Sequence, residues 1–135
     1  MIDYYNTIYT HIATAVKTAH PSVKMTGEYT RSPAQFPCVT CEEIGNIDIQ
    51  ELFDSSRAEK FARLTYRIQV FSNNQNGKKA EARTVFATVD EAIKELGFHR
   101  TAYTTTPDLY ESTMYCITAT YEVVIGVDGT MYGRE

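Results

Sequence analysis

Two cysteines three positions apart are the first residues whose spacing could support chemistry. Cys38 and Cys41 form a CxxC pair, a spacing used by thiol redox sites and by half of many zinc sites. They lie in an alternating pattern typical of a strand, which directs side chains three positions apart to opposite faces. The only further cysteine is Cys116. We therefore expect three buried structural thiols; a metal site and a redox pair are the alternatives.

The histidines and acidic residues show no spacing that predicts a reactive centre. His11, His20 and His99 form no HxH or HxxxH pair, so we interpret them as solvated or capping residues. The acidic residues between Glu42 and Asp54 match no calcium loop. Glycine-rich phosphate loops and nucleophile motifs are absent from the sequence. The sequence thus predicts no enzyme, no metal and no cofactor.

A short basic run stands at the start of the second predicted helix. Lys78, Lys79 and Arg83 are placed where positive charge opposes the helix dipole, so they do not stabilise that helix. A solvated face is the simplest interpretation. Contact with an acidic neighbour or with nucleic acid is the alternative.

The composition of the chain disfavours several classes of function. The 135 residues correspond to one domain, 1–135, and carry 13 basic and 17 acidic side chains for a net charge of −4, which disfavours tight nucleic-acid binding. The apolar runs are too short to cross a membrane, and the first residues lack the pattern of a signal peptide, which favours a cytosol. Ten tyrosines and six phenylalanines without tryptophan suit either Tyr-rich strands or a surface shared with a partner.

Hydrophobic periodicity predicts how the elements follow one another. Helical spacing runs over 3–19, with Asp3 as N-cap, and again over 82–96. Period-two alternation predicts strands at 23–29, 36–43, 62–72, 98–106 and 114–125, with a short strand at 130–132. This order predicts an α+β fold: a mostly antiparallel sheet with two helices packed on one face.

Two segments outside this pattern are candidate interface arms, residues 44–60 and the C-terminal arm 127–135. The first is apolar but has no clean period, so we expect 44–53 to lack regular structure in the free subunit and to order on a partner. The two segments are predicted to supply the two halves of one subunit contact. The candidate interface residues are Ile44, Ile47, Ile49, Leu52, Phe53, Met131, Tyr132 and Arg134.

The second half of the chain resembles a family of phage proteins. The resemblance is carried by residues 66–73 (YRIQVFSN), 76–82 (NGKKAEA), 89–93 (VDEAI), 96–98 (LGF), 105–109 (TTPDL), 121–125 (YEVVI) and 131–134 (MYGR). These runs are similar to tail-completion proteins of long-tailed phages of Gram-positive bacteria, also called tail-terminator, tail-to-head joining or minor capsid proteins. The resemblance covers about residues 60–135 and contains no catalytic signature.

The resemblance implies a structural virion protein. Members form a hexameric ring that caps the tail tube and joins it to the head connector or stopper protein. DNA passes through the lumen without sequence-specific binding. The expected place is the tail–neck junction of the virion, after synthesis in the host cytoplasm. The alternatives are another neck or tail ring component, either a head-completion stopper or a tube-like subunit, and a small metal or redox protein that uses Cys38 and Cys41.

Overall fold

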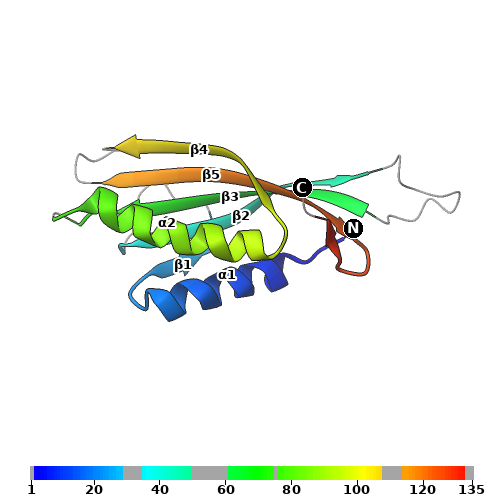
Figure 1. Cartoon of the computed structure of the whole chain (residues 1–135), viewed down its shortest axis with the longest axis horizontal. Coiled ribbons are helices and arrows are strands. Elements are labelled where there is room, and N and C mark those ends of the chain that lie inside the picture. Colours follow the sequence, from blue (N-terminus) through cyan, green and yellow to red (C-terminus); the bar gives the residue numbers. More distant parts are fainter. Residues whose placement is uncertain (1, 29–34, 50–60, 75, 108–113, 133–135) are drawn as a thin grey trace, which may run out of the picture.

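A computed structural model shows two helices beside one six-stranded sheet, and it describes residues 2–28, 35–49, 61–74, 76–107 and 114–132 (Figure 1). The elements are α1 (Tyr5–Ala19), β1 (Lys24–Thr26), β2 (Cys38–Asp48), β3 (Phe61–Ser72), α2 (Lys78–Glu95), β4 (His99–Pro107), β5 (Tyr115–Gly126) and β6 (Met131–Tyr132). The strand order is β1-β2-β3-β5-β4, with β6 paired to β5. Only the pair of β1 and β2 is parallel in this sheet, so the predicted α+β class is confirmed.

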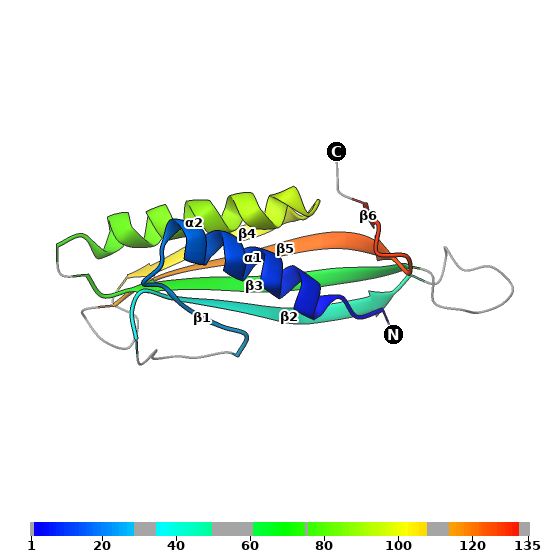
Figure 2. The same cartoon turned by 90° about the horizontal axis from the view of Figure 1, so that it is seen from below.

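Both helices cover the same face of the sheet (Figure 2). Residues three or four apart on each helix face inward, as the periodicity predicts. The buried helix residues include Ile8, Ile12 and Val16 of α1 and Val85, Val89 and Ile93 of α2, and they share one core with Leu64, Tyr66, Ile68 and Val70 of β3. Each such side chain contributes roughly 1.5–3 kcal/mol on burial, so this layer is the main source of stability.

The opposite face of the sheet carries a second, smaller core at one end. Cys38, Phe71, Met114 and Cys116 are all buried there, with Phe36 packed against them. Cys38 is paired with Phe71 across β2 and β3, and Phe71 is paired with Cys116 across β3 and β5. Directly opposed residues share a face, so these three side chains form one row across the sheet.

The helix ends differ slightly from the prediction. The N-cap of α1 is Tyr4, not Asp3, although the Asp3 carboxylate accepts a 3.2 Å hydrogen bond from the backbone N–H of Tyr5. The second helix begins at Lys78, so the basic run stands at its start as predicted, and it directly follows Gly77 at φ 139°. Glycine adopts a positive φ at little cost, which lets the chain turn into α2 at this point.

The expectation that 44–53 lacks regular structure is wrong for residues 44–48, which extend β2. The register of β2 against β3 shifts between Glu43 and Gly45, which marks a bulge at Ile44. A bulge inserts one residue and moves the following side chains to the opposite faces. The alternation that starts at Cys38 therefore breaks after Glu43, and the remainder of the strand has no clean period in the sequence.

Candidate assembly surface

The predicted interface residues of the first arm have different surroundings. Ile44 and Ile47 lie on β2 with 46% and 56% of their surface exposed. Ile49, by contrast, is only 5% exposed, and its backbone N–H donates a 3.2 Å hydrogen bond to the carbonyl oxygen of Phe61. Ile44 and Ile47 are thus available for a contact, whereas Ile49 belongs to the interior. Leu52 and Phe53 lie outside the described residues.

The second arm meets the first at one end of the sheet. Met131 and Tyr132 form β6, and Tyr132 is paired with Val124 of β5. Val124 is paired with Arg63, which is paired with Ile47, so one row of opposed residues joins Ile47 to Tyr132. Arg134 lies outside the part of the chain that the structure describes.

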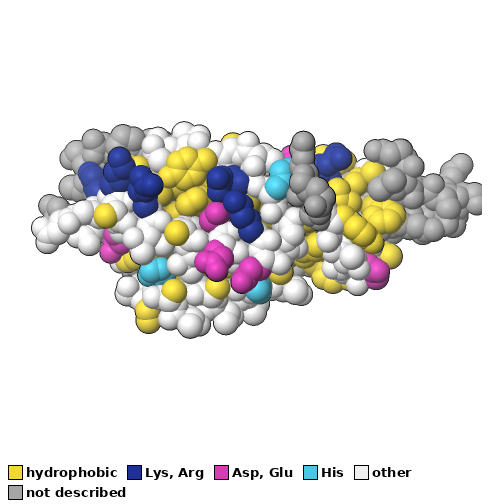
Figure 3. All heavy atoms as spheres, in the orientation of Figure 1, with side chains coloured by type: hydrophobic (Ala, Val, Ile, Leu, Met, Phe, Trp, Pro, Cys, Tyr) yellow, Lys and Arg dark blue, Asp and Glu magenta, His cyan; other side chains and the backbone are white. Residues whose placement is uncertain are grey.

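This end of the sheet presents a set of apolar side chains, which we call the tip patch: the exposed Ile44, Ile47 and Tyr132 and the half-buried Phe61. The rings of Phe61 and Tyr132 lie 5.8 Å apart, and Tyr132 is 49% exposed. Hydrophobic side chains at the right-hand end of Figure 3 belong to the same end of the molecule. The described residues of the two predicted arms thus share one end of the sheet, and their role as two halves of one subunit contact stays a prediction.

A second exposed surface lies at the opposite edge, between α2 and β4. A cavity of about 470 Å³ is lined by Arg83, Phe86, Ala87, Asp90, Arg100 and Tyr103, and we call it the α2–β4 groove. The Phe86 and Tyr103 rings meet edge to face at 5.2 Å, and Tyr103 is 45% exposed. Figure 3 shows Lys and Arg side chains on both sides of hydrophobic ones on this face.

Sequence reasoning identified only one member of this groove. Arg83 belongs to the basic run noted above, whereas Arg100 and Tyr103 stood inside an ordinary alternating strand. The alternating pattern of this strand does not show that Arg100 or Tyr103 belongs to an exposed groove. Pairing of β4 with β5, combined with the packing of α2, brings these side chains beside Arg83.

Asp90 connects the groove residues to the sheet through hydrogen bonds and ion pairs. Its carboxylate accepts hydrogen bonds from the Tyr121 hydroxyl at 2.6 Å and from the Arg100 guanidinium at 2.7 Å, and Lys94 lies 3.4 Å away. Burial opposes ionisation, but the hydrogen bonds from Tyr121 and Arg100 and the charges of Arg100 and Lys94 outweigh it, so the pKa of Asp90 is lowered. Arg100 is held by Asp90, whereas Arg83 makes no ion pair or hydrogen bond with any described residue.

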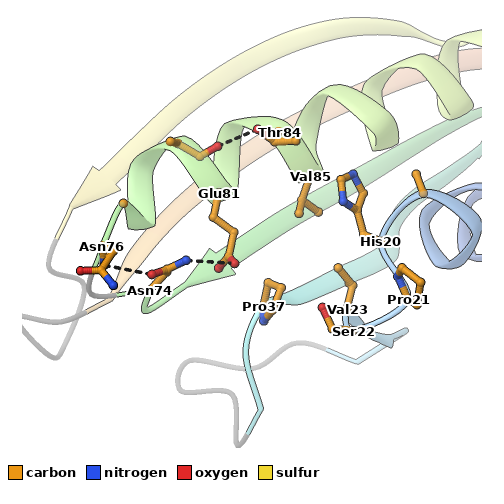
Figure 4. Close-up of a pocket in the computed structure, with 13 residues that line it drawn as sticks. His20, Pro21, Ser22, Val23, Pro37, Asn74, Asn76, Glu81, Thr84 and Val85 are labelled. Atoms are coloured by element: carbon orange, nitrogen blue, oxygen red, sulfur yellow. Dashed lines mark hydrogen bonds between the residues drawn. The ribbon is translucent and has the colours of Figure 1, made fainter.

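A further pocket of about 510 Å³ lies where α1 ends and α2 begins, and Figure 4 shows the residues around it. The carboxylate of Glu81, which lines this pocket, accepts a 2.6 Å hydrogen bond from the Ser72 hydroxyl and a 3.4 Å hydrogen bond from the Asn74 side-chain amide. His20 also lines it and is hydrogen-bonded to Thr88 across 3.0 Å. Glu81, Asn74 and His20 are thus each bonded within the protein.

The three histidines lie at separate places in the fold, and two of them contact the neighbouring helix. His20 follows α1 and reaches α2 through Thr88, and His11 Nε2 lies 3.2 Å from Glu95 Oε1, so both connect the two helices. His99 begins β4, and its Nδ1 is buried without a hydrogen-bond partner in the described residues. The three rings therefore lie apart and form no common site.

The cysteines also lie apart. Cys38 belongs to the small core on the open face, whereas Cys41 belongs to the main core under the helices. Burial raises the pKa of Cys38 to about 11 and that of Cys41 to about 12, and it raises the pKa of Cys116. Buried thiols on opposite faces of one strand cannot form the CxxC disulfide. Among the described residues, no three His, Cys, Asp or Glu side chains are grouped as metal ligands.

Comparison with protein-family models and with characterised proteins gives no match. None of the described helices combines the length and apolar character needed to span a membrane.

Proposed function

We propose that this protein is a non-enzymatic virion component, a tail terminator that caps the tail tube as a hexameric ring and joins the tail to the head connector. The resemblance of residues 60–135 to tail-completion proteins is the basis of the proposal. The observation that supports it in the structure is the presence of two separate surfaces, the tip patch at one end of the sheet and the α2–β4 groove beside the last strand of the sheet.

A ring needs such a pair of surfaces. In a closed ring each subunit contacts its neighbour through one patch and receives the other neighbour on a different patch. The tip patch is apolar and the groove is aromatic and cationic, so they are chemically distinct. The negative net charge of each subunit suits a DNA conduit, because like charge keeps phosphates from adhering to the wall.

Deletion of the gene from a phage that encodes it tests the proposal. A missing terminator should leave overlong or unjoined tails beside intact filled heads, visible by electron microscopy. Heads that lose their DNA would assign the protein to the head-completion stopper, and complete loss of tails would assign it to a tube-like subunit. Phage that assemble normally without the gene would contradict all three assignments, and wild-type complementation provides the control.

A second test addresses the metal or redox alternative. Elemental analysis of purified protein should find no stoichiometric zinc, and thiol titration should find three free thiols under native isolation. Stoichiometric zinc, or a disulfide that joins Cys38 to Cys41, would contradict the proposal, since neither fits thiols on opposite faces of β2.

A further inference from the structure

The last strand of the sheet, β4, has an unpaired outer edge. β4 pairs only with β5, and no described backbone group is bonded to its outer side (Figure 1). Every residue from Arg100 to Thr105 is exposed, whereas most residues of the adjacent β5 are buried. Edge strands are usually protected by charge, proline or a bulge, and residues 102–106 contain none of these. Within the described sheet, this part of β4 is therefore open to another strand.

The α2–β4 groove lies on one face of this open edge. Tyr103 is paired with Ala119, which belongs to the core under the helices. Directly opposed residues share a face, so the Tyr103 ring lies on the helix side of the sheet, where it meets Phe86. A strand added beside β4 would place every second side chain on this same face, next to the groove.

The side of α2 that lines the groove is basic. Arg83 is exposed and makes no ion pair or hydrogen bond with a described residue, and the exposed Lys79 stands one helical turn before it. The groove also contains the carboxylate of Asp90, but this group is already bonded to Arg100 and Tyr121. The charge of Arg83 is therefore available to an occupant of the groove.

Two acidic side chains of α2 point away from the groove. Glu81 accepts a hydrogen bond from Ser72, and Glu95 lies 3.2 Å from the His11 ring of α1. The helix thus directs positive charge toward β4, although the chain as a whole has a net charge of −4. An occupant that brings carboxylates to this side complements it.

A second copy of this chain offers no suitable strand in its described part. β1 and β6, at other margins of the sheet, contain no acidic residue. The acidic residues of β2 already have partners within their own chain: Glu42, Glu43 and Asp48. Nucleic acid would satisfy the positive charge but has no peptide groups to pair with β4. The occupant that fits both the open edge and the charge is an extended segment of another protein.

We infer that β4 and the α2–β4 groove together bind an extended segment of a different protein, which adds a strand to the sheet. Alternate side chains of that segment are apolar and acidic, so that one packs on Tyr103 and another reaches Arg83. Backbone pairing along β4 supplies affinity, and the groove supplies specificity. The inference goes beyond the proposed ring and does not depend on it.

Peptide binding to the purified full chain tests the inference. The probe is a fluorescein-labelled peptide, Thr-Glu-Thr-Val-Thr-Glu-Thr-Val-Thr, whose affinity is measured by fluorescence anisotropy. It should bind saturably, and the same peptide with Lys in place of Glu should bind at least tenfold more weakly. Absence of saturable binding by the Glu peptide, or equal affinities of the two peptides, would overturn the inference.

Backbone methylation separates strand addition from simple charge attraction. The N–H groups of successive residues in a strand point to opposite edges, so only every second one can pair with β4. One peptide is N-methylated at its internal Thr residues and another at its Glu and Val residues. One of the two should lose at least tenfold in affinity, and the other should bind like the parent peptide. Equal affinities of the two methylated peptides would contradict strand addition.

Hydrogen exchange locates the bound peptide. Exchange of the β4 amides should slow when the parent peptide binds, because their outward N–H groups become hydrogen-bonded. Unchanged exchange throughout β4 at saturating peptide would overturn the inference.

A charge variant of the groove provides an independent measurement. Arg83→Glu should weaken binding of the parent peptide at least tenfold, whereas Lys17→Glu, the same charge change at an exposed position of α1, should leave it unchanged. Circular dichroism checks that both variants are folded. Equal effects of the two variants would reduce the result to net charge and contradict a role for the groove.

Two other occupants have their own signatures, and either would overturn the inference. A self-associated wild-type chain that Arg83→Glu dissociates in sedimentation velocity would assign the groove to a second copy. A fluorescent DNA duplex that binds the wild type but not Arg83→Glu would assign it to nucleic acid. Normal tails in the deletion phage would contradict the tail function and leave peptide binding intact, while overlong tails without peptide binding would do the reverse.

Discussion

The hydroxyl of Tyr121 in β5 donates a 2.6 Å hydrogen bond to Oδ1 of Asp90 in α2. Tyr121 is fully buried, so its hydroxyl depends on this carboxylate for a partner. The same oxygen accepts from Arg100 of β4. Asp90 therefore connects the second helix to two adjacent strands and holds the groove together.

Loss of this hydrogen bond should lower stability measurably. Tyr121→Phe should reduce the free energy of unfolding by about 1–2 kcal/mol in urea titrations, since one charge-assisted hydrogen bond is removed and its acceptor keeps Arg100. Arg100→Ala should cost less than about 1 kcal/mol, because the Arg100 side chain is 36% exposed. A larger loss for Arg100→Ala than for Tyr121→Phe would contradict this ranking.

Acid should remove the contribution of Asp90. Its pKa is lowered in the folded chain, so the unfolded chain binds the proton more readily and stability decreases as pH falls below the ordinary value of 3.8. Urea titrations from pH 7 to pH 3 should show this decrease, and it should be smaller in Asp90→Asn. An equal acid slope in both proteins would exclude Asp90 as a source.

Alkali should destabilise the fold through its buried thiols. The pKa values of Cys38 and Cys41 rise from 9.0 to about 11 and about 12, so the folded chain retains protons that the unfolded chain releases. Stability is then complete below pH 9 and decreases as pH rises from about 9 to 12. The variant with Cys38→Ala and Cys41→Ala should start less stable but show a shallower alkaline slope in denaturant titrations; an unchanged slope would contradict the assignment.

Gly27 should be intolerant of a side chain because of Tyr5. A Cβ at Gly27 would stand 2.2 Å from the Tyr5 hydroxyl, which donates a 2.8 Å hydrogen bond to the carbonyl of Cys41. Gly27→Ala should therefore lower stability by about 1–2 kcal/mol through loss of that bond. In a Tyr5→Phe background the same change should cost clearly less, and a double-mutant cycle measures the difference. Additive effects would show that the hydroxyl is not the obstacle.

Two isoleucines two positions apart should respond in opposite ways. Ile47→Ser should change the free energy of unfolding by no more than about 0.5 kcal/mol, because more than half of the side chain is exposed. Ile49→Ser should cost about 2–4 kcal/mol, since that side chain is 5% exposed. Under the proposed function, only Ile47→Ser should give a folded subunit that fails to cap tails. Thermal melts and tail-length measurements check both statements, and equal stability losses would contradict the assignment.

The sequence alone determined the fold class, the order of the elements and the separation of the two CxxC thiols. Strong local periodicity was sufficient for these features: the 3.6-residue spacing of Ile8, Ile12 and Val16 identifies a helix face. The period of two likewise places Cys38 and Cys41 on opposite faces of β2.

Only the tertiary structure decided which surfaces exist. The bulge at Ile44 reverses the alternation within β2, and a single inserted residue leaves no distinctive pattern in the sequence. Ile47 and Tyr132 share one end of the sheet because β3 and β5 lie between them, and Arg83 meets Arg100 and Tyr103 because α2 packs beside β4. Such neighbours depend on long-range pairing of strands, which local periodicity does not encode.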